Sequence, residues 1–122
     1  DGKPTQVQLK AWETIDGVFS ELENAVKLGV KAIEVYGIAD EIFKQAGYEG
    51  MTHHLGHGIG LAPHEPPELN PNYEATFEVG DVFTMEPGLY SEEMKAGMRI
   101  EENYHLTDQG LVQLTSYPRP LA

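Results

Sequence analysis

The sequence contains no cysteine among its 122 residues. This absence excludes disulfide bridges, thiolate zinc sites, iron–sulfur clusters and a cysteine nucleophile. Positive charge is also scarce, because eight lysines and arginines stand against twenty aspartates and glutamates and the net charge is −12. A surface this acidic repels phosphate groups, so we expect neither nucleic acid nor a membrane surface as a partner. No apolar run approaches the roughly 18 residues that a membrane-spanning helix needs.

The composition is otherwise that of one globular domain, with 40% hydrophobic and 23% charged residues. Apolar residues at three- and four-residue steps predict two helices in the first half of the chain. The first begins after Thr5, which with Gln8 has the spacing of a capping box, and ends before Gly29. The second covers residues 32–46 and ends at Gly47. We expect the two helices to pack as a pair on one face of a sheet.

The second half of the chain has a different character. Residues 51–75 are rich in glycine, proline and histidine, which predicts an irregular loop that carries a functional site. Short apolar patterns then predict strands at 81–86, 97–106 and 111–114, with a turn at 107–110 before the last one. The segment 118–120 is expected to be a tail.

Four histidines gather in the loop: His53, His54, His57 and His64. Glycines flank His57, and we expect them to give the backbone unusual dihedral angles and a bulky ligand room to approach. Neutral imidazole is the commonest nitrogen ligand of Zn, Mn, Co and Fe, so His53, His57 and His64 are candidates for one metal site. The alternative is a set of scattered loop histidines. His54 adjoins His53 and is expected to point the other way.

Two strand carboxylates are candidate partners of these histidines. Glu86 ends the strand 81–86, where a charged group leaves the core. Alternation places Arg99 and Glu101 on one face of the next strand and Ile100 on the other. A buried carboxylate is costly unless it meets a cation, which a metal ion or Arg99 would supply. The alternatives are a surface charge for Glu86 and a simple Arg99–Glu101 pair, and alternation alone does not choose between Glu101 and Glu102 as a ligand.

Four motifs, in this order, resemble the C-terminal half of the pita-bread metallopeptidases, the family that includes Xaa-Pro dipeptidase (prolidase), aminopeptidase P, methionine aminopeptidase and creatinase. The motifs are His53-x-x-x-His57-Gly-Ile-Gly-Leu-x-x-His64-Glu, Glu86-Pro-Gly-x-Tyr90, Gly97-x-Arg99-Ile-Glu101, and Thr107-x-x-Gly110 followed by Leu114-Thr115. The resemblance implies an α+β fold with two helices packed on a curved antiparallel sheet. The Pro66-Pro67 context is most similar to the Xaa-Pro branch.

The resemblance also implies a site with two divalent metal ions, Mn, Co, Zn or Fe, held by two aspartates, one histidine and two glutamates. His57 matches the histidine ligand. Glu86 matches the first glutamate, which also acts as the general base. Glu101 matches the bridging glutamate, so the resemblance favours it over Glu102.

Three further residues receive roles from the resemblance alone. His53 and His64 match histidines that bind the substrate and stabilise its polarised carbonyl or the tetrahedral intermediate. Arg99 matches an arginine that orients the metal-bound carboxylates. In the family, the two aspartate ligands precede the part that matches this sequence, which starts at Asp1. We therefore expect residues 1–122 to be the C-terminal part of a longer catalytic domain, which alone binds metal weakly and turns over no substrate.

For the whole enzyme, the resemblance implies a cytoplasmic homodimer that hydrolyses peptide bonds next to proline in small peptides through a metal-bridging hydroxide. One alternative is a non-peptidase member of the same fold, either a creatinase-like C–N hydrolase or a metal-dependent lyase acting on a small organic acid. Another is a non-catalytic peptide-binding module, which typically lacks the metal ligands. The three ligands expected in this half are present, which favours an enzyme.

Overall fold

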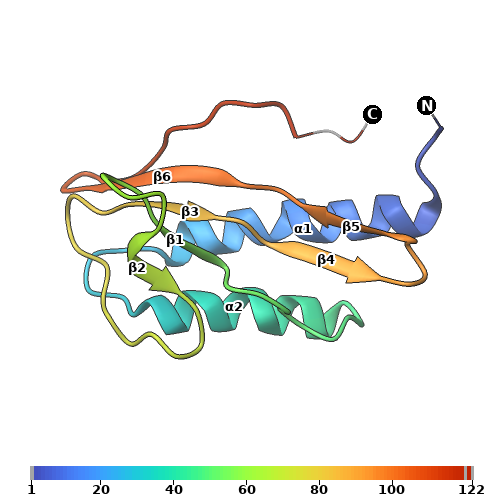
Figure 1. Cartoon of the computed structure of the whole chain (residues 1–122), viewed down its shortest axis with the longest axis horizontal. Coiled ribbons are helices and arrows are strands. Elements are labelled where there is room, and N and C mark those ends of the chain that lie inside the picture. Colours follow the sequence, from blue (N-terminus) through green and yellow to red (C-terminus); the bar gives the residue numbers. More distant parts are fainter. Residues whose placement is uncertain (1, 120, 122) are drawn as a thin grey trace.

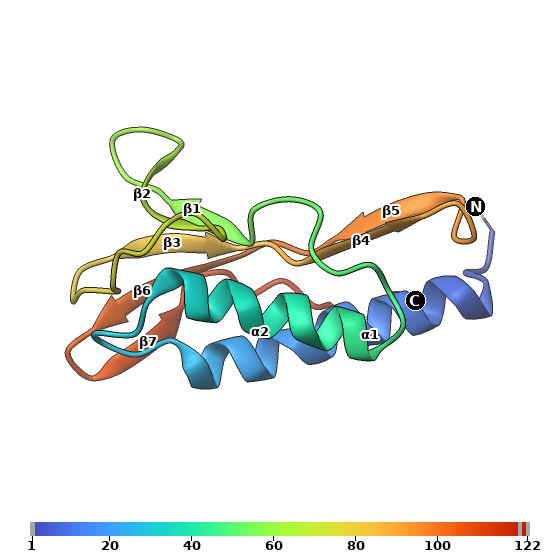
Figure 2. The same ribbon diagram turned by 90° about the horizontal axis from the view of Figure 1, so that it is seen from below.

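The computed structural model describes residues 2–119 and 121, so Asp1, Pro120 of the predicted tail and Ala122 lie outside the described residues. The elements are α1 (Gln6–Ala25), α2 (Ala32–Gln45), β1 (Gly56–Gly58), β2 (Glu65–Leu69), β3 (Val82–Met85), β4 (Gly88–Ser91), β5 (Ala96–Arg99), β6 (Glu102–Thr107) and β7 (Gly110–Gln113). Figures 1 and 2 show both helices on one face of the antiparallel strands. The predicted α+β architecture is confirmed.

Helix α1 begins at the predicted capping box. The Thr5 hydroxyl accepts a hydrogen bond from the backbone N–H of Gln8 at 3.2 Å, and the Gln8 side chain accepts one from the N–H of Thr5 at 2.9 Å. These two bonds give partners to two backbone N–H groups that the start of a helix leaves unpaired. One stripe of the helix is buried against the sheet: Ala11, Ile15, Val18, Phe19 and Leu22.

Helix α2 lies beside α1 and follows a short connection. Gly29 in that connection has a φ of 81°, and Gly47 after the helix has a φ of 92°, both in the left-handed region that glycine tolerates. The N-cap residue Lys31 makes no side-chain capping bond. In the described part of the chain, neither helix is long and apolar enough to cross a membrane.

The strands form two antiparallel sheets, and the β3–β6 and β4–β5 pairs share one register. The larger sheet has the order β2-β1-β3-β6-β7, and β4 pairs with β5. Met85 pairs with Glu102 and Gly88 pairs with Arg99, so the same register runs through the interval between the ladders. The expected strand 97–106 is therefore two strands, β5 and β6, and the strand 81–86 resumes beyond Pro87 as β4. Pro87 lacks the N–H that an unbroken ladder would require.

The prediction of an irregular loop at 51–75 is wrong in part. Strands β1 and β2 lie within it, paired through Gly56 with Leu69 and His57 with Glu68. Their sequences, Gly-His-Gly and Glu-Pro-Pro-Glu-Leu, lack the β-branched residues that signal strands, so only pairing with neighbours creates them.

The expected tail is also wrong as far as Arg119, the last residue before the gap in the description. Its guanidinium lies 4.6 Å from the ring centre of Phe19. It also approaches Asp16 at 3.2 Å and the buried Glu102 at 3.8 Å. Residues that follow β7 thus pack back against α1, because an arginine can cover an aromatic ring and attract nearby carboxylates with its charged end.

Asp40 joins α2 to the segment before β1. Its Oδ2 accepts a hydrogen bond from Lys44 Nζ at 2.6 Å, and its Oδ1 accepts one from the backbone N–H of Met51 at 2.9 Å. The bond from Lys44 is the main reason why the pKa of Asp40 lies below its ordinary value. A carboxyl group with a lowered folded pKa stabilises the fold above its ordinary pKa of about 3.9 and loses this effect as the pH falls.

We therefore expect Asp40→Asn to lower the free energy of unfolding by about 0.5–1 kcal/mol at pH 7. The difference from the unmodified protein should shrink below about pH 4. Urea unfolding at pH 7 and pH 3 measures it, with the exposed Glu21→Gln as the control. A difference of equal size at both pH values would contradict the role of the Asp40 charge.

Candidate metal centre

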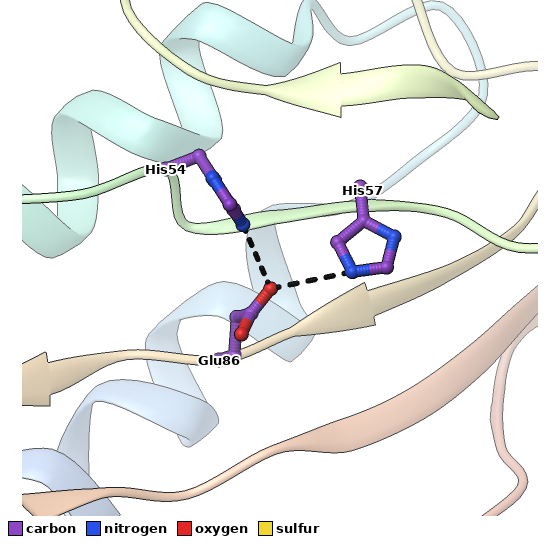
Figure 3. Close-up of side chains that lie close together, drawn as sticks. All are labelled: His54, His57 and Glu86. Atoms are coloured by element: carbon purple, nitrogen blue, oxygen red, sulfur yellow. Dashed lines mark hydrogen bonds and ion pairs between the residues drawn. The ribbon is translucent and has the colours of Figure 1, made fainter. Parts of the chain in front are cut away.

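Three side chains converge where β1 lies beside the end of β3 (Figure 3). His54 precedes β1, His57 lies within it, and Glu86 follows β3. The Nε2 atoms of His54 and His57 lie 3.0 Å and 3.5 Å from Oε1 of Glu86. One ligand atom from each of the three residues lies within 4.8 Å of the others. Two imidazoles and a carboxylate in this arrangement are a donor set for a divalent transition metal.

The Glu86 carboxylate is buried, with 3% of the residue exposed. Arg99 Nη1 lies 3.4 Å from its Oε2. On the other side, the Thr84 hydroxyl lies 3.5 Å from Oε1 and accepts a hydrogen bond from the backbone N–H of His57 at 3.1 Å. Sequence reasoning misses Thr84, although the alternation of strand side chains places it on the same face as Glu86. This threonine connects the strand that carries His57 to the carboxylate.

The tautomer of His57 follows from its neighbour. Its Nδ1 lies 3.0 Å from the carbonyl oxygen of Gly58, which can only accept a hydrogen bond, so the proton is on Nδ1. In the neutral imidazole, Nε2 then carries the lone pair and faces Oε1 of Glu86, so both atoms are electron-pair donors. Such a pair is stable when a cation binds both, and a hydrogen bond from Nδ1 to a carbonyl is the usual support of a metal-binding histidine.

The expectation that His54 points away is wrong, since its Nε2 contacts Glu86 directly. The residues before β1 form neither a helix nor a strand, so no regular alternation sends neighbouring side chains to opposite sides. The sequence motifs name His57 and Glu86 but not His54, so they do not predict this contact.

His53 and His64 lie next to the group. Nδ1 of His53 donates to the carbonyl oxygen of His54 at 2.6 Å, so its Nε2 accepts from the Tyr90 hydroxyl at 3.3 Å. The ring of His64, an exposed residue, lies 3.9 Å from the ring of His57. The structure therefore gathers the four histidines, and Tyr90 of β4 contacts His53 beside them.

The adjacent residues Glu101 and Glu102 lie on opposite faces of the sheet. The register that pairs Met85 with Glu102 places Glu101 opposite Glu86, and residues directly opposite share a face. Glu101 is exposed, and it is not in the three-residue group that the described residues form. Glu102 is buried on the other face, where Thr115 donates to it and Arg119 approaches it. Glu102 therefore neutralises Arg119 rather than facing Glu86.

The glycines of β1 do not have the unusual dihedral angles expected of them. Gly56 and Gly58 are not among the residues with positive φ. A Cβ atom at Gly56 would lie 1.9 Å from the carbonyl oxygen of Thr84, and one at Gly58 would lie 2.1 Å from that of Pro66. Glycine is needed here because neighbouring backbones approach closely, which brings His57 against β3.

Comparison with known proteins gives one consistent result. The family model of metallopeptidase family M24 matches residues 1–108. The Xaa-Pro dipeptidase of Pyrococcus furiosus is 36% identical over 121 residues, which are 98% of this chain and 34% of the dipeptidase. The chain thus spans about one third of the length of this curated relative.

Solved structures agree with the sequence comparison. The prolidase from Pyrococcus horikoshii OT3 superposes with a TM-score of 0.92 at 34% identity, over 99% of this chain and 35% of the prolidase. The X-Pro aminopeptidase from Thermotoga maritima MSB8 gives a TM-score of 0.90 at 34% identity, over 98% of this chain and 34% of the aminopeptidase.

The close approach at Gly56 leads to a stability prediction. We expect Gly56→Ala to lower the free energy of unfolding by about 3 kcal/mol, since the methyl group must displace the backbone of β3. Gly17→Ala is the matched control: an added Cβ there meets nothing within 4 Å, and the residue lies in a helix. It should raise the stability by about 0.5–1 kcal/mol. Thermal or urea unfolding measures both, and equal effects would contradict the packing argument.

Proposed function

The chain belongs to metallopeptidase family M24, and we propose that it is part of a metal-dependent peptidase that hydrolyses peptide bonds next to proline. Its fold matches about a third of a prolidase and of an X-Pro aminopeptidase, which supports the predicted α+β part of a pita-bread fold. The observation that carries the proposal is the buried Glu86 carboxylate, which faces two imidazole nitrogens in a chain of this family.

The names of the relatives support a peptidase over the creatinase-like, lyase and non-catalytic alternatives. Small peptides ending in proline are the substrates that we propose. The homodimeric assembly and the cytoplasmic location expected from the resemblance stay predictions.

The residues present fit a divalent metal ion. Burial of Glu86 is costly unless a cation is near, and the exposed Arg99 approaches only one of its oxygens. Asn103 pairs with Thr84 across the strands and so lies on the same face, where its Oδ1 is buried without a hydrogen-bond partner among the described residues. Imidazole and carboxylate ligands bind Mn, Co, Fe and Zn, and manganese is the ion that we propose for activity assays.

We propose His57, Glu86 and Glu101 as metal ligands. The proton on Nδ1 of His57 supports the first, and the register that places Glu101 opposite Glu86 supports the third. His54 is an alternative imidazole ligand, supported by its distance from Glu86. Two aspartates from a segment preceding residues 1–122 would complete the site, which would make this chain the C-terminal part of the catalytic domain.

Two bound divalent ions would polarise the scissile carbonyl and lower the pKa of water enough for attack near neutral pH. Glu86 accepts the proton that the attacking water releases and delivers it to the amine nitrogen, as the C–O bond forms and the C–N bond breaks. His64 donates a hydrogen bond to the carbonyl oxygen as negative charge develops there. His53 contacts the substrate together with Tyr90, and Arg99 holds the Glu86 carboxylate in its orientation.

Changing Glu86 tests the role of the general base. We expect Glu86→Gln in the full-length protein to lower kcat on an Xaa-Pro dipeptide with Mn²⁺ by about 10²-fold to 10⁴-fold, with a smaller change in KM. The exposed Glu21→Gln removes the same charge from the outer side of α1 and should leave kcat unchanged. Near-normal turnover of Glu86→Gln with both metal ions bound would contradict the proposal.

The two candidate imidazole ligands are separable by metal affinity. We expect His57→Ala to weaken Mn²⁺ binding by about 10-fold to 100-fold, and His54→Ala to weaken it less, because only His57 has its proton held away from the site. Isothermal titration with the full-length protein measures both. A larger loss for His54→Ala would reassign the ligand.

A further inference from the structure

A small cavity of about 190 Å³ adjoins the metal centre, lined by His54, Gly56, His57, His64, Glu68 and Asn70. Two of these residues belong to the group around Glu86, so a molecule in the cavity would lie beside the reacting atoms. The lining contains one carboxylate, that of Glu68, and no lysine or arginine. The cavity is therefore lined by one carboxylate, one amide and three imidazoles.

Glu68 is held in this position by the sheet. It lies in β2 directly opposite His57 in β1, so the two side chains share a face. Asn70 Nδ2 donates a hydrogen bond to its Oε2 at 2.9 Å. Among residues 2–119 and 121, no ion pair joins Glu68 to a cation, and Glu68 is exposed. Its second oxygen is thus free to bind a positively charged group.

We infer that Glu68 makes the enzyme prefer peptides whose residue before proline carries a lysine or arginine side chain. This inference rests on the proposed function. The Glu68 carboxylate lies outside the three-residue metal group and beside the histidines that we propose to face the substrate. A cationic group of the substrate is therefore its natural partner. It would also offset the repulsion between a cationic side chain and the divalent ions in the centre.

The size of the preference follows from the exposure of Glu68. Water screens an exposed ion pair, so we expect about a fivefold preference rather than the larger effect of a fully buried pair. The preference should weaken further at high salt, because ions screen charges that solvent can reach.

The test compares three dipeptides with the full-length protein and Mn²⁺: Lys-Pro, norleucine-Pro, which matches the lysine chain without its charge, and Glu-Pro. The measured quantity is the ratio of kcat/KM for Lys-Pro to kcat/KM for norleucine-Pro. We expect Glu68→Gln to lower this ratio about fivefold, to near one. Glu68→Lys should reverse the order of Lys-Pro and Glu-Pro. Glu21→Gln, which removes the same charge elsewhere, should leave the ratio unchanged.

Other results would overturn either the role of Glu68 or the proposed function. A ratio that Glu68→Gln leaves unchanged would overturn this inference, and so would an equal loss on all three dipeptides, which would show that Glu68 binds the common α-amino group or supports the fold. Hydrolysis of none of them by the unmodified, metal-loaded protein would instead overturn the proposed function, and the inference with it.

Discussion

The burial of one carboxylate, that of Glu86, is the constraint on which the arrangement of the site depends. Removing an ionised group from water costs several kcal/mol unless cations or donors replace the lost hydration. Here Arg99 approaches one oxygen, while the Thr84 hydroxyl and two imidazoles approach the other. The histidines and Arg99 come from different parts of the chain, so they approach the carboxylate only when β1 pairs with β3 and β5 pairs with β4.

The β3–β6 and β4–β5 pairs follow one register, although a short unpaired interval separates them. Glu86 and Pro87 lie between β3 and β4, and the opposite interval holds Ile100 and Glu101. The backbone register thus places Glu101 opposite Glu86, and the helices cover one face of the strands. Glu102, one residue further on, lies among the core groups and neutralises Arg119. A shift of one residue would move each of these side chains to the opposite face of the sheet.

The side chains around Glu86 differ in charge from the chain as a whole. The chain carries a net charge of −12, yet the residues around Glu86 are imidazoles and an arginine. A carboxylate among them suits the binding of divalent cations, and the additional carboxylate of Glu68 at the edge of the same cavity suits a cationic substrate group. The chain spans about one third of the length of the Xaa-Pro dipeptidase that it matches.

Features that depend on neighbouring residues could be predicted from the sequence. The capping box at Thr5, the apolar stripes of both helices and the alternation of Arg99, Ile100 and Glu101 are local patterns, and motif order identifies the family. Strands β1 and β2, the position of His54, the docking of Arg119 and the closeness of Gly56 to Thr84 were decided by tertiary structure alone. These features arise from contacts between residues far apart in the chain, and no local periodicity records such contacts.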